Sequence, residues 1–170
     1  MKITTSYLTM VPLTAADWPL FQALHTEADV IALCFDPPTE AELQQKFQHR
    51  LTPWHNAAEH WLCLTIILRE TGQAIGVTGL CLTSGEAEVG YLLLPQFYGR
   101  GFGTESLTAL VDWAKATQDI VKFKAVVTEG NVGSERVLEK AGFSLAAIIP
   151  DAHTIAGKRY ADHIYYHQAV

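Results

Sequence analysis

The chain has 170 residues, 49% of them hydrophobic and 18% charged, which suits one domain with a core and excludes disorder along the whole chain. Twelve basic against eighteen acidic residues give a net charge of −6, which argues against nucleic-acid or anionic-membrane binding. The three cysteines are widely spaced and indicate no disulfide framework, and no apolar run at the start resembles a signal peptide. We therefore expect a single domain over residues 1–170, located in the cytoplasm.

The first third of the chain is predicted to hold one strand and two helical stretches. Tyr7–Pro12 is the expected strand, and a helix follows with Thr14 as its N-cap and Asp17 three residues later. A second helix begins at Thr39 and is closed by Pro53.

The middle of the chain changes to the two-residue period of strands. Three strands joined by short turns, an antiparallel meander, are expected at Trp61–Leu68, Ala74–Leu82 and Ala87–Leu94.

After the meander, helices and strands alternate. The expected elements are a helix after Pro95 with an apolar face at Leu107, Leu110 and Val111, a strand at Val121–Val127, a helix at Asn131–Ala141 ended by Gly142, and a hairpin of Phe143–Ile149 and Ile155–Gln168 around Asp151–Gly157. This order predicts a mixed α/β sheet with helices on its faces.

A glycine-rich loop between the third meander strand and the next helix is the most informative segment. Gly99, Gly101 and Gly103 allow a sharp turn that points several backbone N–H groups at one spot, and the helix that follows adds the positive end of its dipole. Such a site suits a phosphate or diphosphate, to which Arg100 can add a charge-assisted contact. A dinucleotide fingerprint would need a third glycine where Thr104 stands, and no Walker A string is present.

Two segments together resemble the GNAT superfamily of acyl-CoA N-acyltransferases, and in particular its RimJ/RimL branch. Tyr98-Gly99-Arg100-Gly101-Phe102-Gly103 is similar to the family pattern Gln/Arg-x-x-Gly-x-Gly/Ala, with Tyr98 where Gln or Arg is usual. The second segment, Thr128–Phe143, carries Asn131, Ser134 three residues later, and a terminal Glu-Lys-Ala-Gly-Phe. The resemblance extends from Leu8 to Tyr166.

The resemblance implies a splayed mixed sheet of about seven strands flanked by about four helices, with acetyl-CoA bound where the fourth and fifth strands separate. The free edge of the fourth strand would hold the pantetheine arm, the loop would hold the diphosphate, and Asn131 would contact the arm or cap its helix. The implied cofactor-binding residues are Leu92, Leu93, Leu94, Tyr98, Gly99, Arg100, Gly101, Phe102, Gly103, Thr104 and Asn131. No residue pattern indicates a metal site.

The resemblance also assigns catalytic roles. The backbone N–H near Leu93 would stabilise the oxyanion, and Glu88, acting through water, would take the proton of the amine. Glu86 shares a strand face with Glu88 and is an alternative base. Many members carry a tyrosine acid where this chain has Leu138, so the acid role passes to Ser134.

We therefore predict an acetyl-CoA-dependent N-acetyltransferase in which a primary amine attacks the thioester directly. A protein N-terminus is the favoured acceptor, because of the RimJ/RimL likeness, over a small amine such as a polyamine, amino acid or aminoglycoside. The departures at Tyr98 and Leu138 leave a second interpretation open, a module that binds CoA or another anion without turnover. A monomer or a homodimer is expected.

Overall fold

The computed structural model describes residues 1–168, in which eight strands form one mixed sheet in the order β1-β2-β3-β4-β5-β6-β8-β7. The strands are β1 (Ile3–Thr4), β2 (Leu8–Pro12), β3 (Leu62–Leu68), β4 (Ala74–Thr83), β5 (Glu86–Leu93), β6 (Lys122–Thr128), β7 (Ser144–Ile155) and β8 (Lys158–Gln168). The α-helices are α1 (Trp18–Thr26), α2 (Ala28–Ile31), α3 (Glu40–Arg50), α4 (Phe102–Gln118) and α5 (Val132–Lys140). The predicted α/β fold is confirmed, with a short extra strand, β1, and a short extra helix, α2.

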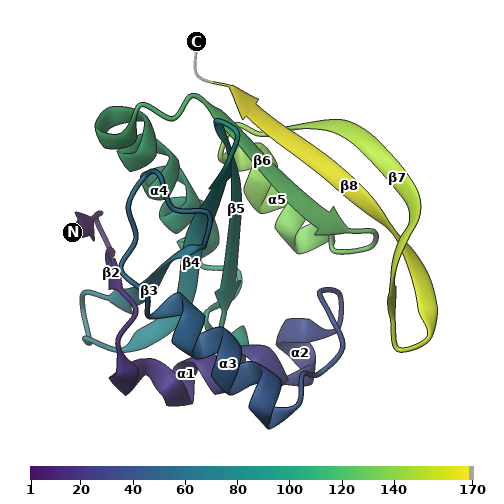
Figure 1. The fold of residues 1–170 in the computed structure, drawn as a ribbon, viewed down its shortest axis with the longest axis horizontal. Coiled ribbons are helices and arrows are strands. Elements are labelled where there is room, and N and C mark those ends of the chain that lie inside the picture. Colours follow the sequence, from purple (N-terminus) through teal and green to yellow (C-terminus); the bar gives the residue numbers. More distant parts are fainter. Residues whose placement is uncertain (169–170) are drawn as a thin grey trace.

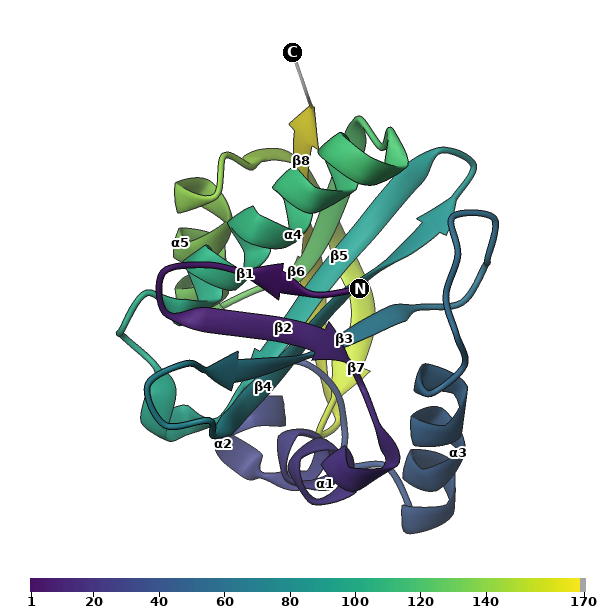
Figure 2. The same cartoon turned by 90° about the vertical axis from the view of Figure 1, so that its left-hand side faces the viewer.

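The sheet separates two groups of helices. Helices α4 and α5 lie on one face, and α1, α2 and α3 lie on the other (Figure 1, Figure 2). Each group covers its own apolar core: one is centred on Leu107, Leu110 and Phe123, the other on Phe21 and Leu43. No helix within residues 1–168 is long and apolar enough to cross a membrane.

Local capping signals fix where several helices begin. The Thr39 hydroxyl accepts a hydrogen bond from the backbone N–H of Glu42 at 3.2 Å and so caps the helix that was predicted to begin there. At the start of the first helical stretch, the Thr14 N–H donates to the Asp17 carboxylate at 2.8 Å. These contacts satisfy N–H groups that the first turn of a helix leaves unpaired.

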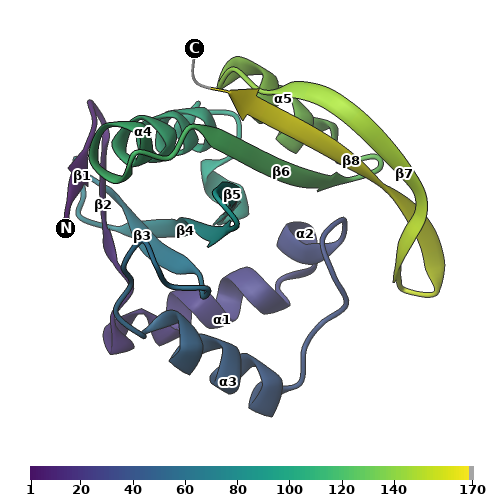
Figure 3. The same ribbon diagram turned by 45° about the horizontal axis from the view of Figure 1, so that its top comes forward.

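The sheet opens between β5 and β6. These two strands run parallel and pair at only three positions, from Glu86 opposite Lys122 to Glu88 opposite Lys124. Beyond Glu88 they diverge, and β6 continues with β8 and β7 as a separate wing (Figure 3). The predicted separation of the fourth and fifth strands is confirmed. These strands are numbered β5 and β6 in the structure because the short strand β1, which was not predicted, precedes them.

The C-terminal hairpin differs from the prediction. Strand β7 does not end at Ile149 but continues to Ile155, and the turn is the short Ala156–Gly157. The register of β7 against β8 shifts between Ile149 and His153, where Asp151 has a positive φ of 49°. A bulge of this kind increases the local twist and re-aims side chains without ending the strand.

Candidate active site

Two adjoining cavities occupy the opening in the sheet. The loop cavity, of about 480 Å³, lies at the glycine-rich loop, and the hairpin cavity, of about 540 Å³, lies between β5, β6 and the β7–β8 hairpin. The residues that line both cavities include Cys34, Tyr91, Asn131 and Ser134. Because they share these walls, the two cavities adjoin, and together they are called the cleft.

The loop cavity brings together most of the predicted cofactor-binding residues. Those that line it are Leu92, Leu93, Tyr98, Gly99, Gly101, Phe102, Gly103, Thr104 and Asn131. Leu94 and Arg100 are not among the lining residues. The Leu94 N–H donates to Ile75 O at 2.9 Å, and its carbonyl accepts from Phe97 N–H at 3.0 Å. The Arg100 guanidinium lies over the Phe102 ring, 4.9 Å from its centroid.

The backbone of the loop is shaped as an anion site. Gly99 and Gly101 have φ values of 73° and 82°, in a region that only glycine enters without strain, and Gly101 is the N-cap of α4. The N–H groups of the first turn of α4 therefore face the loop cavity without partners in the helix. Two basic side chains of α5 that sequence reasoning missed, Arg136 and Lys140, line the same cavity and add positive charge. Their four-residue spacing, which places both on one helix face, is the signal that could have found them.

The free edge of β5 presents backbone N–H groups toward the cleft, and that of Leu93 is one of them. Successive residues of an antiparallel strand point their N–H groups to opposite sides. Since the Leu94 N–H bonds to Ile75 on the β4 side, the Leu93 N–H faces the other side, where β6 has diverged. The amide of Leu93, predicted from the sequence as an oxyanion donor, therefore faces the opening in the sheet.

A hydroxyl pair stands where the two cavities meet. The Tyr91 phenol donates a hydrogen bond to Ser134 Oγ at 3.3 Å, and burial raises the pKa of Tyr91, which keeps the phenol protonated. The Asn131 side chain accepts from the Ser134 N–H at 3.3 Å, so the capping role considered for Asn131 is confirmed. Tyr91 was not predicted as a site residue, although its position two residues before Leu93 puts both on one face of the strand. Leu138 is buried in the apolar core.

The two carboxylates predicted as bases lie away from the cleft walls. Glu88 is half-buried on β5 at the last pairing position with β6, and it lines neither cavity. The Glu86 carboxylate forms an ion pair with Lys122 at 3.1 Å.

The hairpin cavity is acidic. Its described lining residues include Asp36 and Asp162 but no lysine or arginine. Asp36 accepts a hydrogen bond from the Ala156 N–H at 2.7 Å, which ties the segment after α2 to the tip of the β7–β8 hairpin at one side of the cavity. Negative charge at this end and positive charge in the loop cavity suit a cationic and an anionic ligand respectively.

A sheet that splays beside a glycine-rich anion loop, with a cleft running along the free strand edge, has the architecture of the GNAT class. Residues 7–144 match the family described as the acetyltransferase (GNAT) domain, and the chain belongs to this family. The resemblance seen in the two sequence motifs is thereby confirmed.

Individual relatives agree with this assignment. The chain is 28% identical over 97 residues to the uncharacterized N-acetyltransferase p20 of Bacillus licheniformis; the match covers 55% of this chain and 54% of p20, about half the length of each. RimL, a ribosomal L7/L12 alpha-N-protein acetyltransferase solved with coenzyme A, is 19% identical with a TM-score of 0.84 over 99% of this chain and 98% of that one. Spermidine N-acetyltransferase from Vibrio cholerae, solved with CoA and spermine, is 18% identical with a TM-score of 0.83 over 96% of each chain. These two structures share the fold.

Proposed function

We propose that the chain is an acetyl-CoA-dependent N-acetyltransferase that transfers an acetyl group to a primary amine by direct attack. The observation that carries the proposal is the cleft, in which a basic, amide-lined cavity adjoins an acidic one along the free edge of β5. The proposal keeps the single domain over residues 1–170 and the cytoplasmic location predicted from the sequence.

The residues of the loop cavity fit the cofactor. The amides at the start of α4, together with Arg136 and Lys140, would hold the diphosphate, and the edge of β5 would hold the amide-rich pantetheine arm. When bound, acetyl-CoA supplies an activated thioester acyl group. The Leu93 N–H would donate to the thioester carbonyl oxygen, where negative charge develops during attack.

Ser134 would donate to the departing sulfur, with Tyr91 behind it as a second donor. The Tyr91 phenol already donates to Ser134 Oγ, which leaves the serine hydroxyl proton free to point into the cleft. We expect Ser134→Ala to lower kcat by roughly 10- to 100-fold, because a proton donor in the transition state contributes at least this much, while CoA affinity stays unchanged. Tyr91→Phe should lower kcat by a smaller factor.

The control for both variants is Ser144→Ala, which removes an exposed serine hydroxyl on β7. It should retain the parent turnover. If Ser134→Ala also retained the parent turnover, Ser134 would have no part in releasing the thiolate.

Two classes of acceptor suit the hairpin cavity. A protein N-terminus is the one we favour, on the likeness of the motifs to the RimJ/RimL branch. A polyamine is the second candidate, because Asp36 and Asp162 in the cavity can neutralise a second ammonium group.

The test follows free thiol while the protein is incubated with acetyl-CoA and a panel of peptides with free N-termini, polyamines, amino acids and aminoglycosides. Calorimetry with CoA is run on the same preparation. Thiol release with one class identifies the acceptor. Heat with CoA but no thiol release with any amine would overturn the catalytic proposal in favour of a binding module.

A further inference from the structure

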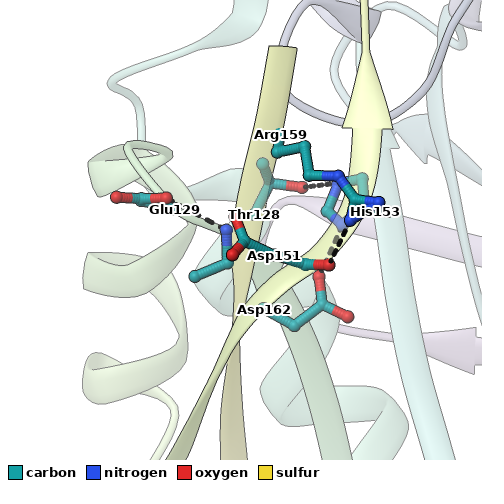
Figure 4. Close-up of polar contacts among 7 residues, drawn as sticks. Thr128, Glu129, Asp151, His153, Arg159 and Asp162 are labelled. Carbon is teal, nitrogen blue, oxygen red and sulfur yellow. Dashed lines mark hydrogen bonds and ion pairs between the residues drawn. The ribbon is translucent and has the colours of Figure 1, made fainter.

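The hairpin cavity contains an imidazole held between a carboxylate and a hydroxyl. His153 Nδ1 lies 2.8 Å from Asp162 Oδ1, and His153 Nε2 lies 3.2 Å from Thr128 Oγ1 (Figure 4). All three side chains line the cavity, and the His153 and Asp162 side chains keep 30% and 24% of their exposure. The imidazole is therefore bonded to protein groups and still accessible to a ligand in the cavity.

The two partners give the ring a defined orientation. A carboxylate can only accept, so Asp162 holds the proton on Nδ1 and leaves the lone pair of a neutral ring on Nε2. That lone pair accepts from the Thr128 hydroxyl through a long hydrogen bond, and an amine that enters the cavity would take the place of this hydroxyl. This is the arrangement of a base oriented by a third group.

Three strands bring these groups together. Asp162 on β8 lies directly opposite Thr128 on β6, and His153 on β7 lies opposite Tyr160, two residues from Asp162 along β8. The register shift before His153 sets this pairing. The His153 and Tyr160 rings stack with centroids 6.3 Å apart, which further restricts the imidazole.

We propose that His153 is the base that takes the proton from the acceptor amine, and that Asp162 is a positioning residue for it; this rests on the acetyltransferase function proposed above. The ammonium gives one proton to His153 Nε2, which later releases it to solvent. The neutral nitrogen then forms its bond to the acyl carbon as the carbon–sulfur bond breaks. The second proton lost by the nitrogen ends on sulfur, by way of the Ser134 hydroxyl.

The placement of the other acid–base groups favours His153. Glu88 lines neither cavity, so it would need a water chain to reach the amine. His163 forms a similar pair with Glu135, but neither lines the cleft, which makes this pair a matched control.

The test compares His153→Gln, Glu88→Gln and His163→Gln with the parent, using an acceptor found by the amine panel. We expect His153→Gln to lower kcat/KM for the amine by about 100-fold or more, as loss of a general base does, with the parent Kd for CoA. His163→Gln should match the parent in both measurements. Asp162→Asn should lower kcat and leave the KM for acetyl-CoA unchanged.

The decisive arm uses a fluorinated analogue of the acceptor, whose less basic amine is already neutral. With this analogue, the ratio of parent kcat/KM to His153→Gln kcat/KM should be at least tenfold smaller, because no proton then has to be removed before attack. Parent-like turnover by His153→Gln, an unchanged defect with the analogue, or loss of turnover in Glu88→Gln alone would overturn the inference. No turnover by the parent itself would instead overturn the proposed function.

Discussion

At the scale of single residues, His25 is a titratable group that folding buries. It lies in α1, 3% exposed, where its Nδ1 donates to Phe21 O at 2.7 Å and its ring lies against Phe21 and Phe35. Burial, more than the nearby positive charge of Lys46, lowers the pKa of His25 from 6.5 to about 4. The folded state thus holds a neutral imidazole in the core beneath α1, α2 and α3.

This burial predicts a loss of stability in acid. Above about pH 6.5 the imidazole is neutral in both states and has no effect; between about pH 6.5 and pH 4 only the unfolded chain takes up the proton. The free energy of unfolding should therefore fall by up to about 3 kcal/mol over that range. We expect His25→Gln to show a shallower fall in urea unfolding measured across the range.

The control for this prediction is His49→Gln, which replaces an exposed histidine of α3. It should keep the pH dependence of the parent. An identical pH dependence in His25→Gln and the parent would mean that His25 is not the group responsible.

At the scale of elements, close backbone packing in the meander predicts a large difference between two glycines. A Cβ atom at Gly79 in β4 would lie 1.8 Å from the Leu62 carbonyl oxygen of β3, so the strands would have to move apart. We expect Gly79→Ala to lower the free energy of unfolding by about 3 kcal/mol, the upper end of usual overpacking costs.

The matched control is Gly90→Ala in β5, where a Cβ would meet only Trp61 ring atoms at 3.8 Å, an ordinary contact. Its cost should be under about 1 kcal/mol. Urea unfolding of both variants measures the difference. Equal costs would show that the β3–β4 approach is not what constrains Gly79.

The elements that sequence could predict are those with local signals. The N-caps Thr39 and Asn131 and the three meander strands β3, β4 and β5 have signals within a few neighbouring residues, and the structure contains all of them. By contrast, β1 has only two residues and no periodicity to detect. The end of β7 was missed because its bulge depends on pairing with β8 and leaves no local pattern.

The same distinction divides the residues of the site. The glycine-rich loop and Ser134 lie within contiguous motifs, so their placement could be predicted. Tyr91, and still more the pair His153 and Asp162, enter the cleft only because the sheet opens and the hairpin folds over it. Sequence alone placed His153 in a turn, where no partner on another strand can be inferred.

At the scale of the whole molecule, the sheet consists of two wings held together weakly at their shared boundary. Strands β4 and β5 pair at eight positions, and β6 and β8 at seven, but β5 and β6 pair at only three. The edge of β5 beyond Glu88 therefore lacks a neighbouring strand on one side. An amide-rich ligand arm can supply the missing hydrogen bonds, as an added strand would.

This boundary predicts which amide hydrogens respond to the cofactor. In the free protein, the Leu93 N–H, which faces the opening, should exchange with solvent faster than the Leu94 N–H, which is bonded to Ile75 O. Saturating acetyl-CoA should slow exchange at Leu93 by about tenfold or more, because the thioester carbonyl oxygen accepts its hydrogen, and should leave Leu94 unchanged. Exchange at the two positions can be followed by NMR. If calorimetry shows bound acetyl-CoA while Leu93 exchanges as before, the thioester carbonyl does not bind the Leu93 N–H, and the amine would have to meet the thioester elsewhere in the cleft.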